Sequence, residues 1–543
     1  MSRSRRDGRA PGTWAAFAVL FGLIFLRFCC YGLEYFPQLD DYIQLHNYTA
    51  YHPDIWPFMQ KLGLLAARPA AGVLDILFWG RLWPALIVGC ALIAGLYAGS
   101  ALLFCRVWSK YFSTGWLFLV IYALLPLGME GTYWLSAANR VVPSLFFTAL
   151  AMGLFQRWCE GGRKGFLIAW FLVQLASMSF YEQGLVLSVT GVLLVALLEL
   201  REGRRRPLWA LLTFVNAGIY FAFTSAFSNS ALYAGRSAVV LPWQEGWRDW
   251  VFLPALRQVL AAFVKGGVWI TGKGFLRGAR LIAAGSLWLW LLLVVVVCEV
   301  LFLLARRERL DRSRGREDLT ALIVGLLMAL APVTIFFVLA NPWFSLRGTV
   351  ASFCGLALMA DTLAGLLLRR LKNCADVTAA LCGVLALVFC VAAVSEVHDY
   401  RATWEDDQAV MAAIRAGTED GRALPAEGDT LILGIEPSYL AEQNFSFHEH
   451  IHGVTESRWA LTGGLQCVSE RGDFPYVKPL PAAVDAQTFG AEQYAALYLY
   501  EPDSRTVRAV TARLGEDGSY NLLAKDGSLA GRVTAEGLVR SKT

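Results

Sequence analysis

The chain has 543 residues, of which 56% are hydrophobic and only 17% are charged, and its mean hydropathy is +0.48. Soluble proteins carry about 25% charged residues, so this composition excludes an ordinary soluble protein. The formal net charge of +5 does not indicate a nucleic-acid partner, because the basic residues lie in short clusters between apolar runs, where they act as topology signals. Ten of the eleven cysteines lie in or beside apolar runs, where a free Cys behaves as a small hydrophobic residue.

Apolar runs of about 20 residues, the length that a membrane-spanning helix needs, recur through the first 400 residues. They predict an all-α polytopic membrane domain over residues 1–399, with eleven spans. The first span is predicted over Trp14–Tyr31. The others are predicted over 83–104, 114–128, 138–156, 165–180, 184–199, 208–226, 282–304, 319–339, 347–368 and 376–395.

Every second connection between these spans is basic. The basic connections contain Arg106 and Lys110, Arg157 to Lys164, Arg201 to Arg206, Arg306 to Arg316, and Arg369 to Lys372. The connections at 129–137 and 181–183 contain no Lys or Arg. The positive-inside rule then predicts a cytoplasmic N-terminus, and the odd number of spans predicts an extracytoplasmic C-terminus. The Arg- and Ala-rich composition favours a bacterial inner membrane.

Three segments are predicted outside the membrane core. Residues 33–82 form a first outside loop that carries an acidic pair. Residues 227–281 form an interfacial loop, because Trp250 to Val264 is amphipathic and rich in aromatic residues. Residues 400–543 form a small extracytoplasmic α+β domain, which begins with a helix over Tyr400 to Ala416. Its strands are predicted at Thr430–Ile435, Ala495–Tyr500, Thr506–Thr511 and Tyr520–Ala524.

Polar and aromatic residues gather in four clusters, each at the predicted outside end of a span. The clusters are Asp40-Asp41-Tyr42, Tyr133 to Arg140, Ser179 to Gly184, and Asn341 to Arg347. Carboxylates are costly beside a bilayer unless they face a cavity, a partner or a substrate. One-sided placement is what a single cavity open to the outer leaflet requires, whereas scattered structural residues have no preferred side.

Transfer of a sugar from a lipid phosphate matches these residue types. A carboxylate must take the proton from the acceptor hydroxyl, and Asp40 or Asp41 is the candidate. Guanidinium groups can stabilise the leaving phosphate in a bidentate way. The candidates for that role are Arg68, Arg140 and Arg347. The candidates for holding the sugar are Tyr133, Trp134, Asn139, Tyr181 and Glu182.

Each candidate also has a structural interpretation. Asp40 and Asp41 can cap a following helix. Arg68 can snorkel at a helix start before Pro69, or pair with Asp75 seven residues later. Arg140 and Arg347 can anchor lipid headgroups. Glu182 has no charged residue close in sequence, which favours a functional role. A further pattern, His448, His450 and His452, would share one face of a strand; an exposed polar strand is the preferred interpretation over a metal face.

The layout, with Leu39-Asp40-Asp41-Tyr42 and Ala67-Arg68-Pro69 in the first outside loop, resembles the GT-C superfamily of integral-membrane glycosyltransferases. Within it, the chain most resembles bacterial transferases that decorate O-antigen or other surface glycans. The resemblance implies a polyprenyl-phosphate sugar donor, a glycan or lipid acceptor, surrounding membrane lipids, and Asp40 or Asp41 as the base. Some members use a divalent cation, Mg²⁺ or Mn²⁺, but no second acidic cluster here completes such a site. Transfer in one displacement predicts inversion at the anomeric carbon.

Two other classes of protein remain as alternatives. A transporter or flippase for a lipid-linked saccharide would also carry charges in a membrane cavity. It would be expected to show internal repeats or paired broken helices, which the sequence lacks. A non-catalytic assembly protein would use the spans only as an anchor, and eleven spans exceed what anchoring needs.

Overall fold

The computed structural model describes residues 13–52, 54, 56, 57, 59, 63–227, 238–305, 315–437 and 451–541. The chain divides into two units. The first contains Met1–Tyr35, Asp54–Leu74 and Pro84–Val397, and the second contains Phe36–Pro53, Asp75–Trp83 and His398–Thr543. The boundary between the two units at Val397 and His398 lies close to the one expected from composition at 399/400. The predicted first outside loop, residues 33–82, is divided between the two units.

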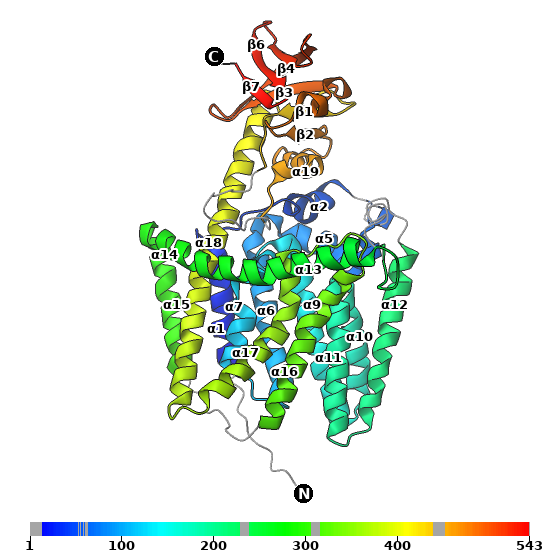
Figure 1. The fold of residues 1–543 in the computed structure, drawn as a ribbon, viewed down its shortest axis with the longest axis vertical. Helices are drawn as coiled ribbons and strands as arrows, with labels where there is room; N and C mark the ends of the chain where they lie inside the picture. Colours follow the sequence, from blue (N-terminus) through cyan, green and yellow to red (C-terminus); the bar gives the residue numbers. More distant parts are fainter. Residues whose placement is uncertain are drawn as a thin grey trace. The chain divides into compact units, whose positions relative to one another are not determined.

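The first unit consists of helices that stand side by side (Figure 1). They are α1 (Thr13–Phe25), α6 (Leu86–Ser109), α7 (Trp116–Leu124), α9 (Leu135–Gly161), α10 (Lys164–Phe180), α11 (Glu182–Arg201), α12 (Leu212–Ala226), α15 (Leu287–Ala305), α16 (Gly315–Leu330), α17 (Phe353–Leu368) and the first part of α18 (Cys374–Gly417). Shorter helical segments of this unit are η1 (Leu26–Cys29), α4 (Leu64–Ala67), η4 (Pro126–Gly128), α8 (Met129–Thr132), η5 (Arg206–Leu211), η8 (Ala331–Phe337) and η9 (Leu346–Ser352). Two further segments, α5 (Pro69–Leu77) and η3 (Trp79–Ala85), are divided between the two units.

Among the described residues, eight helices are long and apolar enough to cross a membrane, fewer than the eleven spans predicted. Seven coincide with predicted spans, and the eighth covers Trp247–Ala284, a segment predicted to be interfacial. The four other predicted spans correspond to shorter apolar helices, at Trp14–Cys29, Trp116–Thr132, Lys164–Phe180 and Leu287–Phe302. One reason is visible at α7, where Leu125 leaves the helical conformation with ψ 116° because Pro126 follows it.

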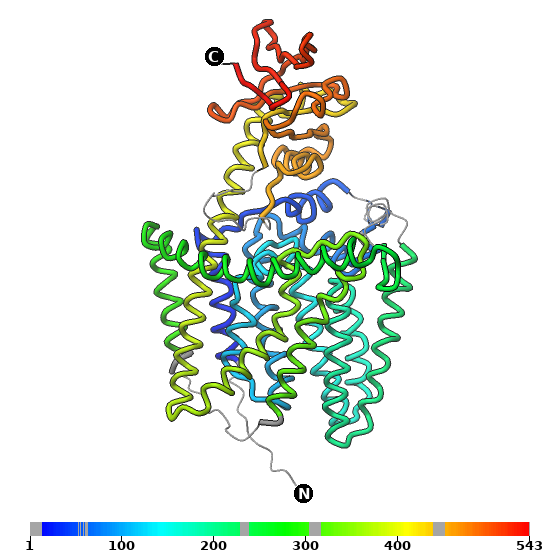
Figure 2. Tube along the Cα trace, viewed as in Figure 1, coloured from blue at the N-terminus to red at the C-terminus, as the bar shows by residue number. Residues whose placement is uncertain are grey.

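The segment Trp247–Ala284 forms one helical path through η6 (Trp247–Phe252), α13 (Leu253–Leu260), η7 (Ala261–Lys273) and α14 (Gly274–Ala284). Figures 1 and 2 show that this path runs across the ends of the upright helices instead of alongside them. Its apolar residues include the exposed Trp250 and Val264, and Lys265 lies beside them. Such an amphipathic helix suits the headgroup region of a membrane.

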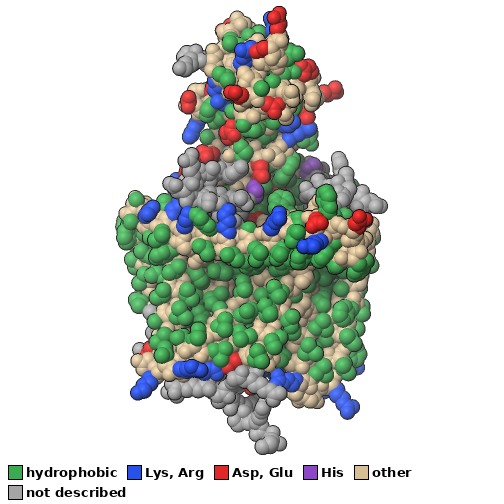
Figure 3. Space-filling view, in the orientation of Figure 1, with side chains coloured by type: hydrophobic (Ala, Val, Ile, Leu, Met, Phe, Trp, Pro, Cys, Tyr) green, Lys and Arg blue, Asp and Glu red, His purple; other side chains and the backbone are tan. Residues whose placement is uncertain are grey.

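The upright helices present a continuous band of hydrophobic side chains, bordered at both ends by Lys and Arg (Figure 3). On α12, for example, Phe214, Phe221 and Phe223 are 56%, 56% and 43% exposed. Exposed apolar surface on this scale marks contact with a membrane. The chain is therefore a polytopic α-helical membrane protein.

The ends of α6, α9 and α11 meet around a buried carboxylate. Glu199 accepts hydrogen bonds from Lys110, Tyr111 and Arg204, and Lys110 also lies 2.7 Å from Glu160. Basic residues of two connections, Lys110 and Arg204, thus gather at one end of the helices. The basic clusters at 1–12 and 306–314 lie outside the described residues.

The second unit contains a sheet in the strand order β2-β1-β3-β4-β5-β6-β7. Its strands are β1 (Thr430–Leu433), β2 (Val477–Leu480), β3 (Ala496–Glu501), β4 (Thr506–Leu514), β5 (Tyr520–Ala524), β6 (Leu529–Thr534) and β7 (Gly537–Arg540). β1 is parallel to β2 and β3, and the remaining pairs are antiparallel. The other elements are η2 (Ile43–Asn47), α2 (Tyr48–Tyr51), η10 (Val454–Glu456), α19 (Arg458–Val468), α20 (Ala486–Phe489) and η11 (Ala491–Gln493).

This sheet confirms the α+β prediction. β1, β3, β4 and β5 lie at the predicted positions, and the helix predicted over Tyr400 to Ala416 is the last part of α18. Side chains such as Leu433, Leu499 and Leu522 form its buried core. The sequence analysis missed β2, β6 and β7, which are short or contain Pro, Gly and charged residues.

Two glycines allow α16 and α17 to pack closely. A Cβ added at Gly355 would lie 2.3 Å from the carbonyl oxygen of Gly325 and 2.3 Å from the amide nitrogen of Ala329. Small residues at helix crossings let the backbones approach in this way within membranes.

We expect Gly355→Ala to lower the midpoint of thermal unfolding in detergent, because the backbones of α16 and α17 must move apart at a cost of about 1–3 kcal/mol. Gly365→Ala is the matched control, since no atom lies within 4 Å of a Cβ added there on the same helix. That control should leave the midpoint unchanged or raise it slightly, as alanine favours helix. Equal losses in the two variants would contradict the close crossing.

Candidate functional site

Arg68 forms an ion pair at one end of the first unit. Its Nε lies 2.9 Å from both carboxylate oxygens of Glu182, and its Cζ lies 4.8 Å from the centre of the Tyr181 ring. Tyr181 is extended and ends α10, so Glu182 becomes the first residue of α11, where a helix favours negative charge. Gly184 brings this turn against Ser144 of α9. The structure therefore unites three of the predicted site residues.

A second arginine has the same kind of surroundings. The Arg347 guanidinium lies 3.6 Å from Glu130, whose other oxygen accepts the Arg347 backbone N–H at 2.9 Å, and it also lies 5.7 Å from the Trp134 ring centre. Gly131 makes this possible, because a Cβ there would lie 3.1 Å from the Arg347 Cα. Sequence reasoning missed Glu130, although the argument used for Glu182 applies equally to this acidic residue in an apolar run.

The two arginine groups are connected through Gln183 and Tyr181. The Gln183 side chain donates to the carbonyl oxygens of Pro332 and Gly348, each at 3.0 Å, so the start of α11 is tied to the residue after Arg347. The Tyr181 hydroxyl is under the electrostatic influence of both arginines, Arg68 and Arg347. Four charged groups are thus gathered around one buried phenol.

The remaining predicted residues of this unit are buried in the helices. Arg140 is 5% exposed and donates to Asn139 Oδ1 at 2.7 Å and to the Ser136 carbonyl oxygen. Tyr133 stacks on Phe28 with ring centres 5.0 Å apart. Burial excludes Arg140 as a surface anchor for lipid headgroups, and it leaves Arg68 and Arg347, with side chains 28% and 27% exposed, as the accessible cations.

Asp40 and Asp41 belong to the second unit and differ in their surroundings. Asp41 is fully buried, and its Oδ2 accepts the Gln38 N–H at 2.9 Å. Asp40 is half-buried, and its carbonyl oxygen accepts the first helical N–H groups, from Ile43 and Gln44. The Asp41 side chain therefore holds the turn that precedes the helix. Leu39 precedes the pair with φ +30°, a conformation that a non-glycine residue rarely adopts.

The turn that carries the pair packs against α18 within the second unit. Gln38 donates to the Tyr400 carbonyl oxygen at 2.8 Å, and Gln408 donates to the Tyr42 hydroxyl at 2.8 Å. Burial raises the pKa of Tyr42 well above its usual value, and the nearby Asp407 charge raises it further, so this phenol stays neutral and supports the turn. Sequence reasoning missed Gln408 and Asp407, whose helical spacing alone does not show what they contact.

A metal site is not evident in the part of the chain that the structure describes, where no three His, Cys, Asp or Glu side chains are grouped to hold an ion. His448 and His450 lie outside the described residues. His452 is described, and its Nδ1 lies 2.7 Å from Glu456.

No protein-family model matches the chain, and no curated protein matches it either. Its class therefore rests on the structure: a polytopic α-helical membrane protein with a C-terminal α+β region, and with two arginine–carboxylate pairs at one end of the helices.

The two aspartates should respond differently to substitution. We expect Asp41→Ala to speed amide hydrogen exchange at Gln38 and to lower the thermal midpoint, because a buried N–H loses its acceptor at a cost of about 1–3 kcal/mol. Asp40→Ala is the control and should leave the Gln38 exchange rate close to that of the wild type. Peptide-resolved exchange over residues 36–44 measures both, and equal acceleration in the two variants would show that Asp41 has no special role in this turn.

Proposed function

We propose that this protein is a GT-C-type membrane glycosyltransferase that moves one sugar from a polyprenyl-phosphate carrier to a surface glycan or lipid acceptor. The observation that carries the proposal is the pair of half-exposed arginines, Arg68 and Arg347, around Tyr181. Each is held by a carboxylate and an aromatic ring, which fixes its orientation. Two oriented guanidinium groups suit a phosphate that gains charge as it leaves.

Asp40 is the proposed general base. Asp41 is fully buried and bound to the Gln38 N–H, which suits a residue that positions the turn, whereas Asp40 keeps part of its surface accessible. In the proposed reaction, Asp40 takes the proton from the acceptor hydroxyl, and the acceptor oxygen attacks the anomeric carbon. The bond from that carbon to the phosphate oxygen breaks, and polyprenyl phosphate leaves on Arg68 and Arg347. This single displacement inverts the anomeric configuration.

The other predicted residues take supporting roles in this proposal. Trp134 and Tyr181 are buried, and their rings would position the guanidinium groups of Arg347 and Arg68. Arg140, Asn139 and Tyr133 are buried and would shape the helices that carry these groups. The eleven-span topology, with the N-terminus in the cytoplasm of a bacterial cell and residues 400–543 outside, is part of the same proposal, and the basic residues gathered around Glu199 support it.

The reaction is tested with purified protein in nanodiscs and a panel of polyprenyl-phosphate sugars, by measuring release of polyprenyl phosphate. We expect release with the wild type and a loss of about 100-fold or more with Asp40→Asn, because the base is removed. Arg68→Ala and Arg347→Ala should each reduce the rate by about 10- to 1,000-fold.

Arg401→Ala is the matched control, since Arg401 pairs with Glu405 on α18 at 2.7 Å and has no proposed part in the reaction. Full activity of Asp40→Asn, or retention of anomeric configuration, would refute the proposed mechanism. Saccharide movement across the bilayer without release of polyprenyl phosphate would instead identify a flippase.

Topology is tested by cysteine labelling in spheroplasts with a membrane-impermeant maleimide. We expect Ser504→Cys, in the exposed turn between β3 and β4, to react in intact spheroplasts. Asn373→Cys, in the exposed turn before α18, should react only after permeabilisation, because it belongs to a basic connection. The wild type supplies the background, as all its described cysteines except Cys298 are buried. The reverse labelling pattern would overturn the proposed orientation.

A further inference from the structure

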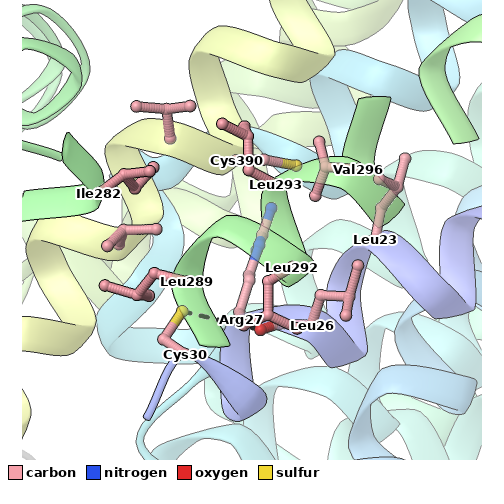
Figure 4. Close-up of a pocket in the computed structure, with 12 residues that line it drawn as sticks. Leu23, Leu26, Arg27, Cys30, Ile282, Leu289, Leu292, Leu293, Val296 and Cys390 are labelled. Carbon is pink, nitrogen blue, oxygen red and sulfur yellow. Dashed lines mark hydrogen bonds between the residues drawn. The ribbon is translucent and has the colours of Figure 1, made fainter. Parts of the chain in front are cut away.

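A recess lies between η1, α14, α15 and α18 (Figure 4), and no residue of the two arginine pairs lines it. Its interior holds about 30 Å³ of free space, and the recess is open on one side. Aliphatic side chains form most of its wall, among them Leu289, Leu293 and Val296 of α15. Because the opposite face of α15 is exposed, with Leu291 and Val294 51% and 57% accessible, the recess lies at the lipid-facing edge of the helices.

Arg27 is the one charged residue among those that line this recess. Its side chain is only 4% exposed, and Figure 4 shows the guanidinium in the midst of the aliphatic lining. Its Nη2 donates to the Ala123 carbonyl oxygen at 2.9 Å, while its Nε is buried without an acceptor. Among the described residues, none forms an ion pair with Arg27. A guanidinium remains charged in a protein, so this charge has no counter-ion within the described part of the chain.

The contact with Ala123 explains part of the position of Arg27. Pro126 ends α7 and leaves carbonyl groups of its last turn without helical partners, and a cation at a helix C-terminus is favourable. One hydrogen bond to a carbonyl uses one of five guanidinium N–H donors. A buried charge is costly unless it is paired, so the helix end alone does not account for the residue.

Two contacts of α15 define the ends of the recess. At one end, Trp288 Nε1 donates to the Cys29 carbonyl oxygen. At the other, the Glu299 carboxylate packs against Gly22 of α1, where an added Cβ would lie 2.2 Å from Oε1. Gly22 lies five residues before Arg27 in the chain. Glu299 packs against Gly22 and forms no ion pair with Arg27. α15 therefore contacts the η1 region on both sides of the recess and leaves a gap beside Arg27.

The helix that crosses the end of the recess locates it relative to a membrane. Ile282 of α14 lines the recess, and α14 belongs to the amphipathic segment that runs across the upright helices (Figure 2). Arg277 of α14 donates to the Ser395 hydroxyl at 3.3 Å, next to the lining residue Val394. The side of the recess formed by Ile282 and Val394 is therefore at interfacial depth, where lipid phosphates lie, and the side formed by Val296 extends toward the hydrocarbon region.

We propose that the recess binds an anionic glycerophospholipid of the surrounding membrane. The lipid phosphate accepts hydrogen bonds from Arg27, and one hydrocarbon chain lies along Leu289, Leu293 and Val296. Guanidinium binds phosphate through paired N–H donors. A lipid with net negative charge is favoured over a zwitterionic one, because no acidic side chain lines the recess to receive an ammonium group. This lipid site is separate from the proposed reaction at Arg68 and Arg347.

The proposal is tested on the full-length protein, purified free of lipid in detergent, by native mass spectrometry with dioleoyl phosphatidylglycerol or dioleoyl phosphatidylcholine at equal concentrations. We expect the wild type to bind phosphatidylglycerol in preference to phosphatidylcholine. Arg27→Gln keeps an N–H donor for Ala123 and loses the charge, and it should weaken phosphatidylglycerol binding by about tenfold or more. Leu292→Trp keeps Arg27, fills the recess and should weaken binding to a similar extent.

Arg280→Gln is the matched control, because Arg280 is exposed on α14 and does not line the recess; it should bind phosphatidylglycerol as the wild type does. If Arg27→Gln fails to fold, Leu292→Trp decides the question. Unchanged phosphatidylglycerol binding in Leu292→Trp, or equal binding of the two lipids by the wild type, overturns the proposal. Displacement of phosphatidylglycerol by equimolar polyprenyl phosphate would instead assign the recess to the carrier lipid.

Discussion

Pairing of carboxylates with basic side chains is the interaction on which the first unit depends. Glu182 holds Arg68, Glu130 holds Arg347, and Glu199 holds Lys110 and Arg204. Charges between apolar helices are costly unless they are paired and hydrogen-bonded. Removing one partner would leave the other as an unpaired charge between apolar helices. Each pair therefore also constrains the positions of the helices that carry it. Arg27 lacks such a partner among the described residues, and the proposed lipid phosphate would supply one.

Close backbone approach makes these pairs possible. Gly131 admits η9 beside α8 and brings Arg347 to Glu130, and Gly184 admits Ser144 beside the first turn of α11. Between the two pairs, Gln183 bonds the carbonyl oxygens of η8 and η9. Small residues and one amide thus set the spacing of the charged groups, and the proposed phosphate chemistry uses that spacing.

Asp40 and Asp41 are adjacent in the chain but have different surroundings. Asp41 is committed to the Gln38 backbone N–H, while Asp40 keeps part of its surface, so two adjacent residues of identical chemistry have separate roles. This difference supports Asp40 over Asp41 as the proposed base, a choice that the sequence leaves open.

By itself, the sequence determined the class of protein, most apolar helices, the amphipathic stretch at Trp250 to Val264 and four of the strands, because hydrophobic periodicity and composition are local properties. It also marked Arg68, Glu182 and Arg347 as unusual. It did not predict which carboxylate meets which arginine: Glu130 lies 217 residues from Arg347, and Glu182 lies 114 from Arg68. Only the tertiary structure decided these partners, the burial of Arg140 and the recess at Arg27, because each depends on how closely distant helices pack.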